Sequence, residues 1–494
     1  MNAGAGTLRT LMIVLGSSWL GFALTILRVL VLPAKLGDTG LGQVTLAVSF
    51  TTFFGIFTSL GTSVYLVRAI AQDHSRADRY LSNALLLRAV MGLLVLGVMI
   101  AAGHIAGYAP ETRTIILIVA CATVISTVSN VFESGLQGLG QMGWRAMAMT
   151  SGQVTATCVG VALLLSGASP LLYALCIPLG AIVELALVLM YFALQHPIRF
   201  LPDRAVMTAL LIGGLPLFLW GVLQTAYGQI DATILSLFAG EHVVGWFGAA
   251  SQITNVLIVI PTAITAVTMP VLCTLYVQPG PEFDRLAARV LGITLLILAP
   301  VGAGLAIAAP DVLRLLPYPA AFRQATPALA LLALAVPVTG MLMVLSSLAV
   351  AIGQERAWLK ISAFAVCVFP PLYVGFIWWF QAHQANGATG AALANLIGET
   401  ALVAWAWRVL PPRVRQSTFL RQAPQIAMLT LLMIGAVGLL QRVGVPILAY
   451  VPVGAIVYGL GAGLARLVTR GDLAQVRRAL VPRRSRGDAE AVTP

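Results

Sequence analysis

The sequence predicts an all-α membrane protein with about fourteen transmembrane helices. Of its 494 residues, 59% are hydrophobic and only 9% are charged, and the mean hydropathy is +0.94. Soluble domains carry roughly 25% charged residues, so this composition excludes a water-soluble globular protein. The apolar residues form long unbroken runs, whereas the strands of a membrane β-barrel alternate apolar and polar residues. A polytopic helical membrane protein is what remains.

Fourteen stretches are long enough to cross the hydrocarbon core, which takes about 20 apolar residues per helix. The first is longer than the core of a signal peptide, and no small-residue cleavage site follows it. The connections are shorter than the roughly 50 residues of a small domain. The expected spans are 10–33, 42–66, 81–106, 114–138, 145–166, 169–193, 205–237, 243–272, 286–308, 326–352, 357–380, 386–408, 423–441 and 445–466.

The basic residues predict the orientation. With the N-terminus inside, 22 of the 29 lysines and arginines lie on the cytoplasmic side and 5 on the outer side, as the positive-inside rule requires. Fourteen spans place both termini in the cytoplasm. The basic tail 466–486 is expected to rest on anionic lipid head groups. Since topology accounts for the net charge of +12, no nucleic-acid partner is expected.

Three pairs of matching segments indicate a duplicated six-helix unit. Their offsets are 203, 213 and 215 residues, in the same order along both halves. Because six is even, both halves enter the membrane from the same side. Such parallel repeats are related by an axis along the membrane normal, and the cargo site usually lies where they meet. The pairs are LGDTGLGQVTLA (36–47) with AGEHVVGWFGAA (239–250), LGQ (139–141) with IGQ (352–354), and ELALV (184–188) with ETALV (399–403).

The repeat suggests four parts of the chain. Residues 1–200 form an N-terminal six-helix lobe, and residues 201–410 form a C-terminal six-helix lobe. Residues 411–468 add two further helices, and residues 469–494 are a basic cytoplasmic tail. Two bundles around a central cleft, without a large extramembrane domain, are typical of a transporter that alternates between two openings.

Six ionisable residues lie inside the expected spans, where each is costly to insert. Two of them, Arg28 and Asp231, differ by 203 and therefore occupy equivalent places in the two halves. Opposite charges at equivalent places are predicted to form an outer gate pair that also meets the cargo. In the alternative, Arg28 extends to the outer surface and Asp231 caps the turn that follows its helix.

Of the other four ionisable residues, three have two interpretations each and Glu133 has one. Glu184 and Glu399 are also related by the repeat, and they are expected either to couple transport to protons or to brace helices through hydrogen bonds. Arg88 is expected to line an anion-attracting cavity or to extend toward the cytoplasm. Glu133 is expected to form a local hydrogen bond.

The sequence contains no motif for catalysis or cofactor binding. No GxxxxGK[ST] loop and no HExxH motif occur, and there are only two lysines, so ATP hydrolysis and zinc chemistry are not expected. The five cysteines have no CxxC spacing, which favours small buried residues over metal ligands. The chain is therefore expected to be a non-enzyme without cofactor.

Several segments resemble the polysaccharide repeat-unit flippases of the multidrug/oligosaccharidyl-lipid/polysaccharide flippase superfamily. RVLVLPAKLGDTGLGQVTLAVSF (28–50) and SLGTSVYLVRAIA (59–71) are similar to their first two helices, and 213–272 is similar to the seventh and eighth. The recognisable features of 213–272 are Pro216, the Gln229-Ile230-Asp231 step, Gly240 with Gly245, and Pro261 with Pro270.

The resemblance implies two six-helix lobes arranged in a V, with two additional helices. It also implies a cargo, an undecaprenyl-diphosphate-linked oligosaccharide that is moved to the outer leaflet of the bacterial inner membrane. Related lipid II flippases carry a cavity arginine at the place of Arg28, but Val29 stands where they have an acidic residue. Expected partners are this lipid-linked substrate, membrane lipids, a polysaccharide polymerase and a chain-length regulator.

Two other functions stay open at this point. A multidrug exporter of the same superfamily would move cations and would need acidic residues in a lobe cavity. A membrane scaffold for a glycan-synthesis complex would not transport at all.

Overall fold

The computed structural model describes residues 3–196, 199–276, 280–415, 419–465 and 467, and within them it contains helices and no strand. The predicted basic tail, at residue 466 and beyond 467, lies outside the described residues. The helices are α1 Ala3–Ser59, α2 Thr62–Gln72, α3 Ala77–Ile105, α4 Pro110–Gly138, α5 Met142–Leu165, α6 Pro170–Ala174, α7 Cys176–Gln195, α8 Arg204–Phe238, α9 Glu241–Tyr276, α10 Pro281–Leu315, α11 Thr326–Ala351, α12 Glu355–Gln384, α13 Gly387–Val409, α14 Pro412–Arg415, α15 Phe419–Arg442 and α16 Ile447–Leu464, with short 3₁₀ turns at His74–Arg76 and Ala320–Ala325.

The predicted fold class is confirmed, but the count of fourteen spans is not. Among the described residues, eleven helices are long and apolar enough to cross a membrane, or up to twelve if a bent pair in α8 is one span. The predicted span 10–33 and most of the predicted span 42–66 lie in α1, whose backbone leaves the helical region at Gly37 with φ 70° and ψ −176°; the end of the second span lies in α2. The predicted span 386–408 forms α13, but Asn395 and Glu399 lower its hydropathy, and it is not among the eleven.

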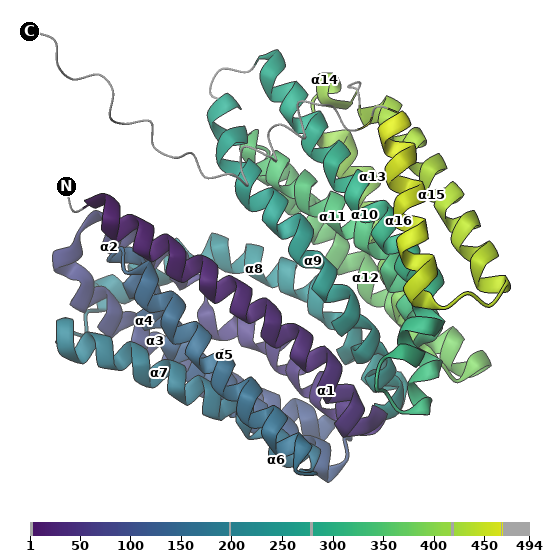
Figure 1. Ribbon diagram of the computed structural model, residues 1–494. Helices are drawn as coiled ribbons and strands as arrows, with labels where there is room; N and C mark the ends of the chain where they lie inside the picture. The colour runs from purple at the N-terminus through teal and green to yellow at the C-terminus, as the bar shows by residue number, and fades with distance from the viewer. Residues whose placement is uncertain (1–2, 197–198, 277–279, 416–418, 466, 468–494) are drawn as a thin grey trace, which may run out of the picture.

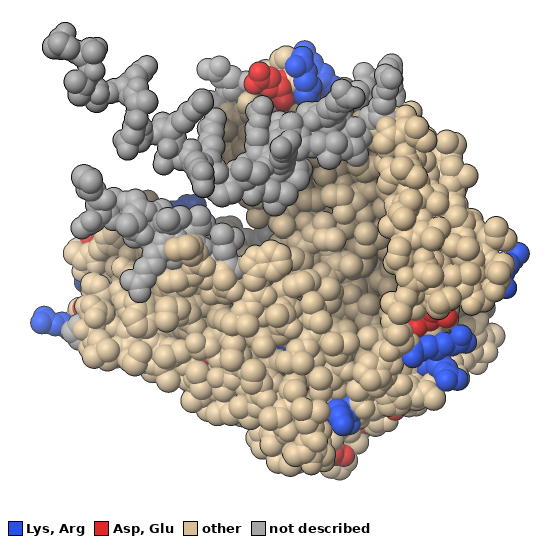
Figure 2. All heavy atoms as spheres, viewed as in Figure 1, with Lys and Arg blue, Asp and Glu red and all other residues tan. Residues whose placement is uncertain are grey.

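The surface supports a membrane location. Figure 2 shows a broad face that is almost free of charged side chains, with lysines, arginines and carboxylates near its edges. Large apolar side chains such as Trp19, Leu93 and Leu431 are well exposed. Exposed apolar surface on this scale is stable only in contact with lipid. The chain is therefore a multi-pass membrane protein.

The helices pack in two groups with the same internal arrangement. In the first group α1 packs against α5, and α7 packs against α4 and α5; in the second group α8 packs against α12, and α13 packs against α11 and α12. Gly140 after α4 and Gly353 after α11 both have positive φ, at 73° and 68°. This common conformation fits the predicted match of LGQ with IGQ, because glycine adopts positive φ without strain.

The two groups form a V. Figure 1 shows that they come together at the end of the molecule away from the N-terminus and diverge toward the N-terminus. Their main contact is between α1 and α9, with α8 also packed on α1 and α2. Helices α15 and α16 pack on each other and on α10, outside the second group.

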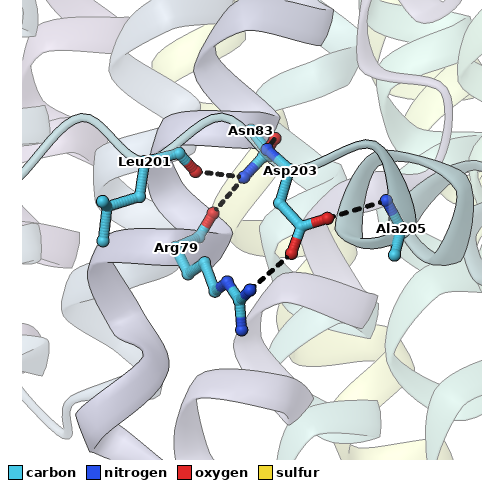
Figure 3. A network of polar contacts seen from close by, with 5 residues as sticks. All are labelled: Arg79, Asn83, Leu201, Asp203 and Ala205. Carbon is cyan, nitrogen blue, oxygen red and sulfur yellow. Dashed lines mark hydrogen bonds and ion pairs between the residues drawn. The ribbon is translucent and has the colours of Figure 1, made fainter.

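The connection between the groups is fixed to α3 (Figure 3). Asn83 donates a hydrogen bond to the carbonyl oxygen of Leu201 at 2.9 Å, and Arg79 pairs with Asp203 at 2.7 Å. Asp203 also accepts a hydrogen bond from the backbone N–H of Ala205, which caps the start of α8. The first turns of α8 are therefore tied to the first group, although the helix continues into the second.

Helix α8 bends shortly after the turns that are attached to α3. The segments Arg204–Leu215 and Leu217–Leu223 meet at 46°. Near this bend the chain backbones are in close contact, because a Cβ at Gly214 would lie 2.6 Å from the carbonyl oxygen of Leu60. The ring centroids of Phe57 and Phe218 are 5.8 Å apart. The two groups thus touch at this level as well as at the start of α9, where Gly42 and Gly245 are in close contact with the opposite chain segment.

Candidate functional site

Two cavities adjoin where α1 and α9 cross. The first, here called the Arg28 cavity, has a volume of about 290 Å³ and lies mainly among α1, α5 and α9, with one residue each from α6 and α7. The second, the Asp231 cavity, has about 380 Å³ and lies mainly among α8, α9, α11 and α13. Thr45, Gln252 and Asn255 line both cavities. The two halves of the chain therefore each contribute one cavity to a common polar region.

Arg28 is the charged side chain of the first cavity. It is half-buried, and its Nε has no hydrogen-bond partner among the described residues. Thr25, Thr157 and Tyr173 line the same cavity. Side chains that reach past the hydrocarbon extend into water or lipid head groups, whereas this one faces a protein cavity. A guanidinium whose Nε has no partner among the described residues is suited in such a place to bind phosphate, whose oxygens match its planar fork of donors.

Asp231 has different surroundings in the second cavity. Its carboxylate accepts a hydrogen bond from the backbone N–H of Ala232 at 2.7 Å. Glu399 lines the same cavity, is buried, and accepts a hydrogen bond from the hydroxyl of Thr339. No lysine or arginine is found among the described residues that line this cavity. The expectation that Asp231 caps the turn after its helix is wrong, since α8 continues to Phe238.

The predicted pair between Arg28 and Asp231 is not formed in this structure. Among the described residues, no ion pair joins these two groups; they lie in adjoining cavities instead. Because these two repeat-related residues carry opposite charges, the first cavity is basic and the second is acidic.

The contact that closes the V is made by other residues, here called the outer clasp after the side on which the predicted orientation places it. Gln43 donates to Glu241 at 3.0 Å, and Trp246 donates to Asp38 at 3.3 Å. Asp38 and Glu241 are 203 residues apart, and so are Gln43 and Trp246. The two hydrogen bonds are therefore equivalent by the repeat, with donor and acceptor exchanged between the halves. The hydroxyl of Thr112, on α4, adds a third hydrogen bond to Glu241.

Two glycines allow the clasp to close. A Cβ at Gly42 would overlap the carbonyl oxygen of Glu241, and a Cβ at Gly245 would overlap the carbonyl oxygen of Asp38. These glycines are also equivalent at offset 203. The part of α1 after the kink at Gly37 and the start of α9 can approach this closely only because both residues lack a side chain.

Two tyrosines extend the clasp. Tyr108, between α3 and α4, is hydrogen-bonded to Ser236 of α8 at 2.8 Å. Tyr318, between α10 and α11, donates to the carbonyl oxygen of Val29 in α1 at 2.5 Å. Each loop thus reaches the opposite half. The sequence analysis identified neither the tyrosines nor the other clasp residues. The alignment of 36–47 with 239–250 did match Asp38 with Glu241 as acidic residues, but it assigned them no contact.

Arg88 is not among the residues that line the Arg28 and Asp231 cavities, and its role in an anion-attracting cavity stays a prediction. Its side chain is buried, with Nε donating to the hydroxyl of Thr62 at 3.0 Å and an outer nitrogen donating to Ser63 at 2.5 Å. These residues begin α2, after Gly61 with φ 66°. Arg88 therefore fixes the start of α2 to α3.

Replacing Arg88 should lower stability more than it lowers binding of any cargo. We expect Arg88→Ala to destabilise the protein by about 2–4 kcal/mol, because it leaves a cavity and two hydroxyls without their donor. Thermal unfolding of the purified protein in detergent measures this effect. Arg68→Ala, at an exposed position of α2, is the matched control. Equal melting temperatures for Arg88→Ala and the parent would refute the bracing role.

Glu133 and Glu184 lie together in the first group. Glu133 is buried and pairs with Arg145 at 3.4 Å, rather than forming the simple local hydrogen bond that was expected. Glu184, on α7, lies against α5, because a Cβ at Gly152 would lie 3.1 Å from its carboxylate. Glu399, the repeat equivalent of Glu184, instead lies in the Asp231 cavity. The two repeat-related glutamates thus have different surroundings.

Comparison with known proteins identifies the family. The profile of one family, described as polysaccharide biosynthesis protein, matches residues 7–275, which is more than half of the chain. The chain belongs to this family. None of the curated protein sequences matches it.

Solved structures share the fold of this polysaccharide biosynthesis family member. The lipid II flippase MurJ in an inward closed conformation has a TM-score of 0.73 at 15% identity, and the match covers 93% of this chain and 98% of that one. An inward-facing multidrug resistance MATE family transporter of the MOP superfamily has a TM-score of 0.64 at 21% identity, over 82% and 95% of the two chains. A MOP superfamily transporter from Pyrococcus furiosus has a TM-score of 0.52 at 18% identity, over 85% and 94%. The predicted resemblance to this superfamily is confirmed.

Proposed function

We propose that this protein is a flippase for undecaprenyl-diphosphate-linked oligosaccharide repeat units. It would move them from the cytoplasmic to the outer leaflet of the bacterial inner membrane, for the synthesis of exopolysaccharide, O-antigen or capsule. The observation that carries the proposal is Arg28, which lines a cavity where the two halves of a polysaccharide biosynthesis protein meet, and whose Nε has no hydrogen-bond partner among the described residues.

The chemistry of the cargo explains the need for such a cavity. A diphosphate sugar cannot cross hydrocarbon unaided, because desolvation of its charges costs tens of kcal/mol. A polar cavity with a guanidinium replaces part of the lost hydration. The polyprenyl chain, being apolar, can remain in the bilayer while the head group crosses between the lobes.

The outer clasp corresponds to a state of the transport cycle in which the outer end is closed. With both termini in the cytoplasm, the turn at Gly37 and the start of α9 lie on the outer side, so the clasp closes the outer end. We propose lobe limits near residues 200 and 410, with α15 and α16 as the additional pair. Cargo release to the outer leaflet then requires the clasp to separate while the contact near Leu60 and Gly214 is retained. A polymerase and a chain-length regulator remain predicted partners.

Flipping can be tested directly in proteoliposomes. Vesicles with the purified protein and a labelled undecaprenyl-diphosphate oligosaccharide are treated with a membrane-impermeant glycosidase. We expect the inner-leaflet pool to become accessible, whereas vesicles without protein keep it protected. A labelled phosphatidylcholine in the same vesicles should not move. Protection equal to that of protein-free vesicles would contradict the proposal.

The Asp231 cavity favours one second candidate, a cation-coupled multidrug exporter. Two carboxylates without a basic neighbour among the described lining residues suit an organic cation. Uptake of a cationic dye into inverted vesicles, which corresponds to export from the cell, distinguishes the two functions. Export of cationic dyes, together with no movement of the lipid-linked oligosaccharide, would select the exporter.

A further inference from the structure

A small cavity lies at the turn between α3 and α4, away from the two central cavities. It has a volume of about 240 Å³, and Arg113, His104 and Pro110 line the part next to the turn. Arg113 is half-buried, and its Nε has no hydrogen-bond partner among the described residues. Nothing in the proposed flipping path uses this arginine.

The cavity changes from basic to apolar along its length. Ile100 lies one helical turn from His104 on α3, and Leu117 and Ala120 lie one and two turns beyond Arg113 on α4, a distance of about 10 Å. Ile100 and Leu117 are half-exposed at 41% and 42%, so this part opens toward the lipid. A basic end at the level of a helix turn and an apolar end within the membrane match a phospholipid, with its phosphate at the top and an acyl chain below.

Gly103 shows that the space is not filled by the protein. This glycine of α3 is buried and lines the cavity, yet a Cβ built on it would meet no atom within 4 Å. A larger residue at this position would therefore extend into the cavity without displacing a helix.

From these features we propose that the α3–α4 cavity binds one anionic phospholipid of the membrane surface, through a hydrogen bond from Arg113 to the phosphodiester. Arginine is suited to this ligand because its guanidinium is always charged and binds two phosphate oxygens at once. Arg113 follows Thr112, whose hydroxyl bonds Glu241 in the outer clasp. The lipid would accordingly lie beside the helix end that helps to close the V. This proposal does not depend on the identity of the flipped cargo.

Native mass spectrometry of the purified full-length protein tests the proposal. The protein is mixed with equal amounts of phosphatidylglycerol and phosphatidylcholine, and the bound lipid is counted. We expect preferential retention of phosphatidylglycerol, reduced about tenfold by Arg113→Gln, as for loss of one charged hydrogen bond. Gly103→Leu should reduce it as well, and this variant keeps the test valid if Arg113→Gln unfolds.

The control is the outer-side arginine of the other half. Arg323, at the turn before α11, is exposed and lies on none of the described cavities, so Arg323→Gln should retain phosphatidylglycerol like the parent. Equal retention by the parent, Arg113→Gln and Gly103→Leu would overturn the proposal. An equal loss in Arg323→Gln would overturn it too, since it would indicate general surface charge. Displacement of the lipid by the same concentration of inorganic phosphate would show a free-anion site instead.

Discussion

Gly42→Ala and Gly245→Ala should each open the outer end of the protein. In both variants the new methyl group would overlap a backbone carbonyl oxygen, of Glu241 or of Asp38, and backbone atoms of packed helices cannot move aside as a flexible side chain can. A protein that is almost entirely closed becomes almost entirely open when its closed state is destabilised by about 5.5 kcal/mol relative to its open state. We expect flipping to fall at least about tenfold, because the closed state of the cycle is depleted.

Accessibility of an introduced cysteine measures the opening. Ser49→Cys, on the wall of the Asp231 cavity, should react faster with a membrane-impermeant thiol reagent from outside in either glycine variant. Gly16→Ala is the matched control, since a Cβ at Gly16 in the same helix meets no atom within 4 Å. Unchanged labelling and unchanged flipping in both glycine variants would show that the clasp is not a gate.

Arg28→Ala should abolish most of the transport while leaving the fold intact. Loss of one charge-assisted hydrogen bond to the diphosphate corresponds to a roughly ten- to hundredfold weaker interaction. Arg28→Lys should keep part of the activity, because an ammonium supplies the charge without the planar fork. The measurement is flipping in proteoliposomes, with polymer export in cells as the second readout.

Lys35 provides the comparison for Arg28. It is a basic and exposed residue further along α1, so Lys35→Ala should flip cargo like the parent. If Arg28→Ala exported polymer at the parental level, Arg28 would have no role in binding the cargo. Wild-type function in the double variant Arg28→Ala/Asp231→Ala would favour a non-transporting scaffold.

The sequence predicted the parts of this structure that depend on local pattern. Apolar runs located the helices, and the offset of 203 correctly related the turn at Gly37 to the one at Gly240. The number of spans was less certain, because hydropathy alone does not show that α1 breaks at Gly37, or that a helix as polar as α13 is covered by its neighbours.

Side-chain partners were harder to predict, because they depend on how distant helices pack. Opposite charge and equivalent position suggested that Arg28 meets Asp231, yet the two face adjoining cavities. Arg88 was expected at a cavity or the surface, but its partners are hydroxyls at the start of α2. No single-sequence signal specifies such contacts, since Thr62 and Ser63 on the preceding helix are two of many serines and threonines in the sequence.

A reversible cross-link across the clasp tests the central claim most directly. Cysteines at Gln43 and Glu241, whose side chains bond at 3.0 Å, can be joined by a short reducible thiol linker, with each single variant as a control for the native cysteines. Alternating access predicts that the linked protein stops flipping lipid-linked oligosaccharide and that reduction restores the rate of the same double-cysteine protein before linking. Flipping by the fully linked protein at the rate of the reduced one would contradict it.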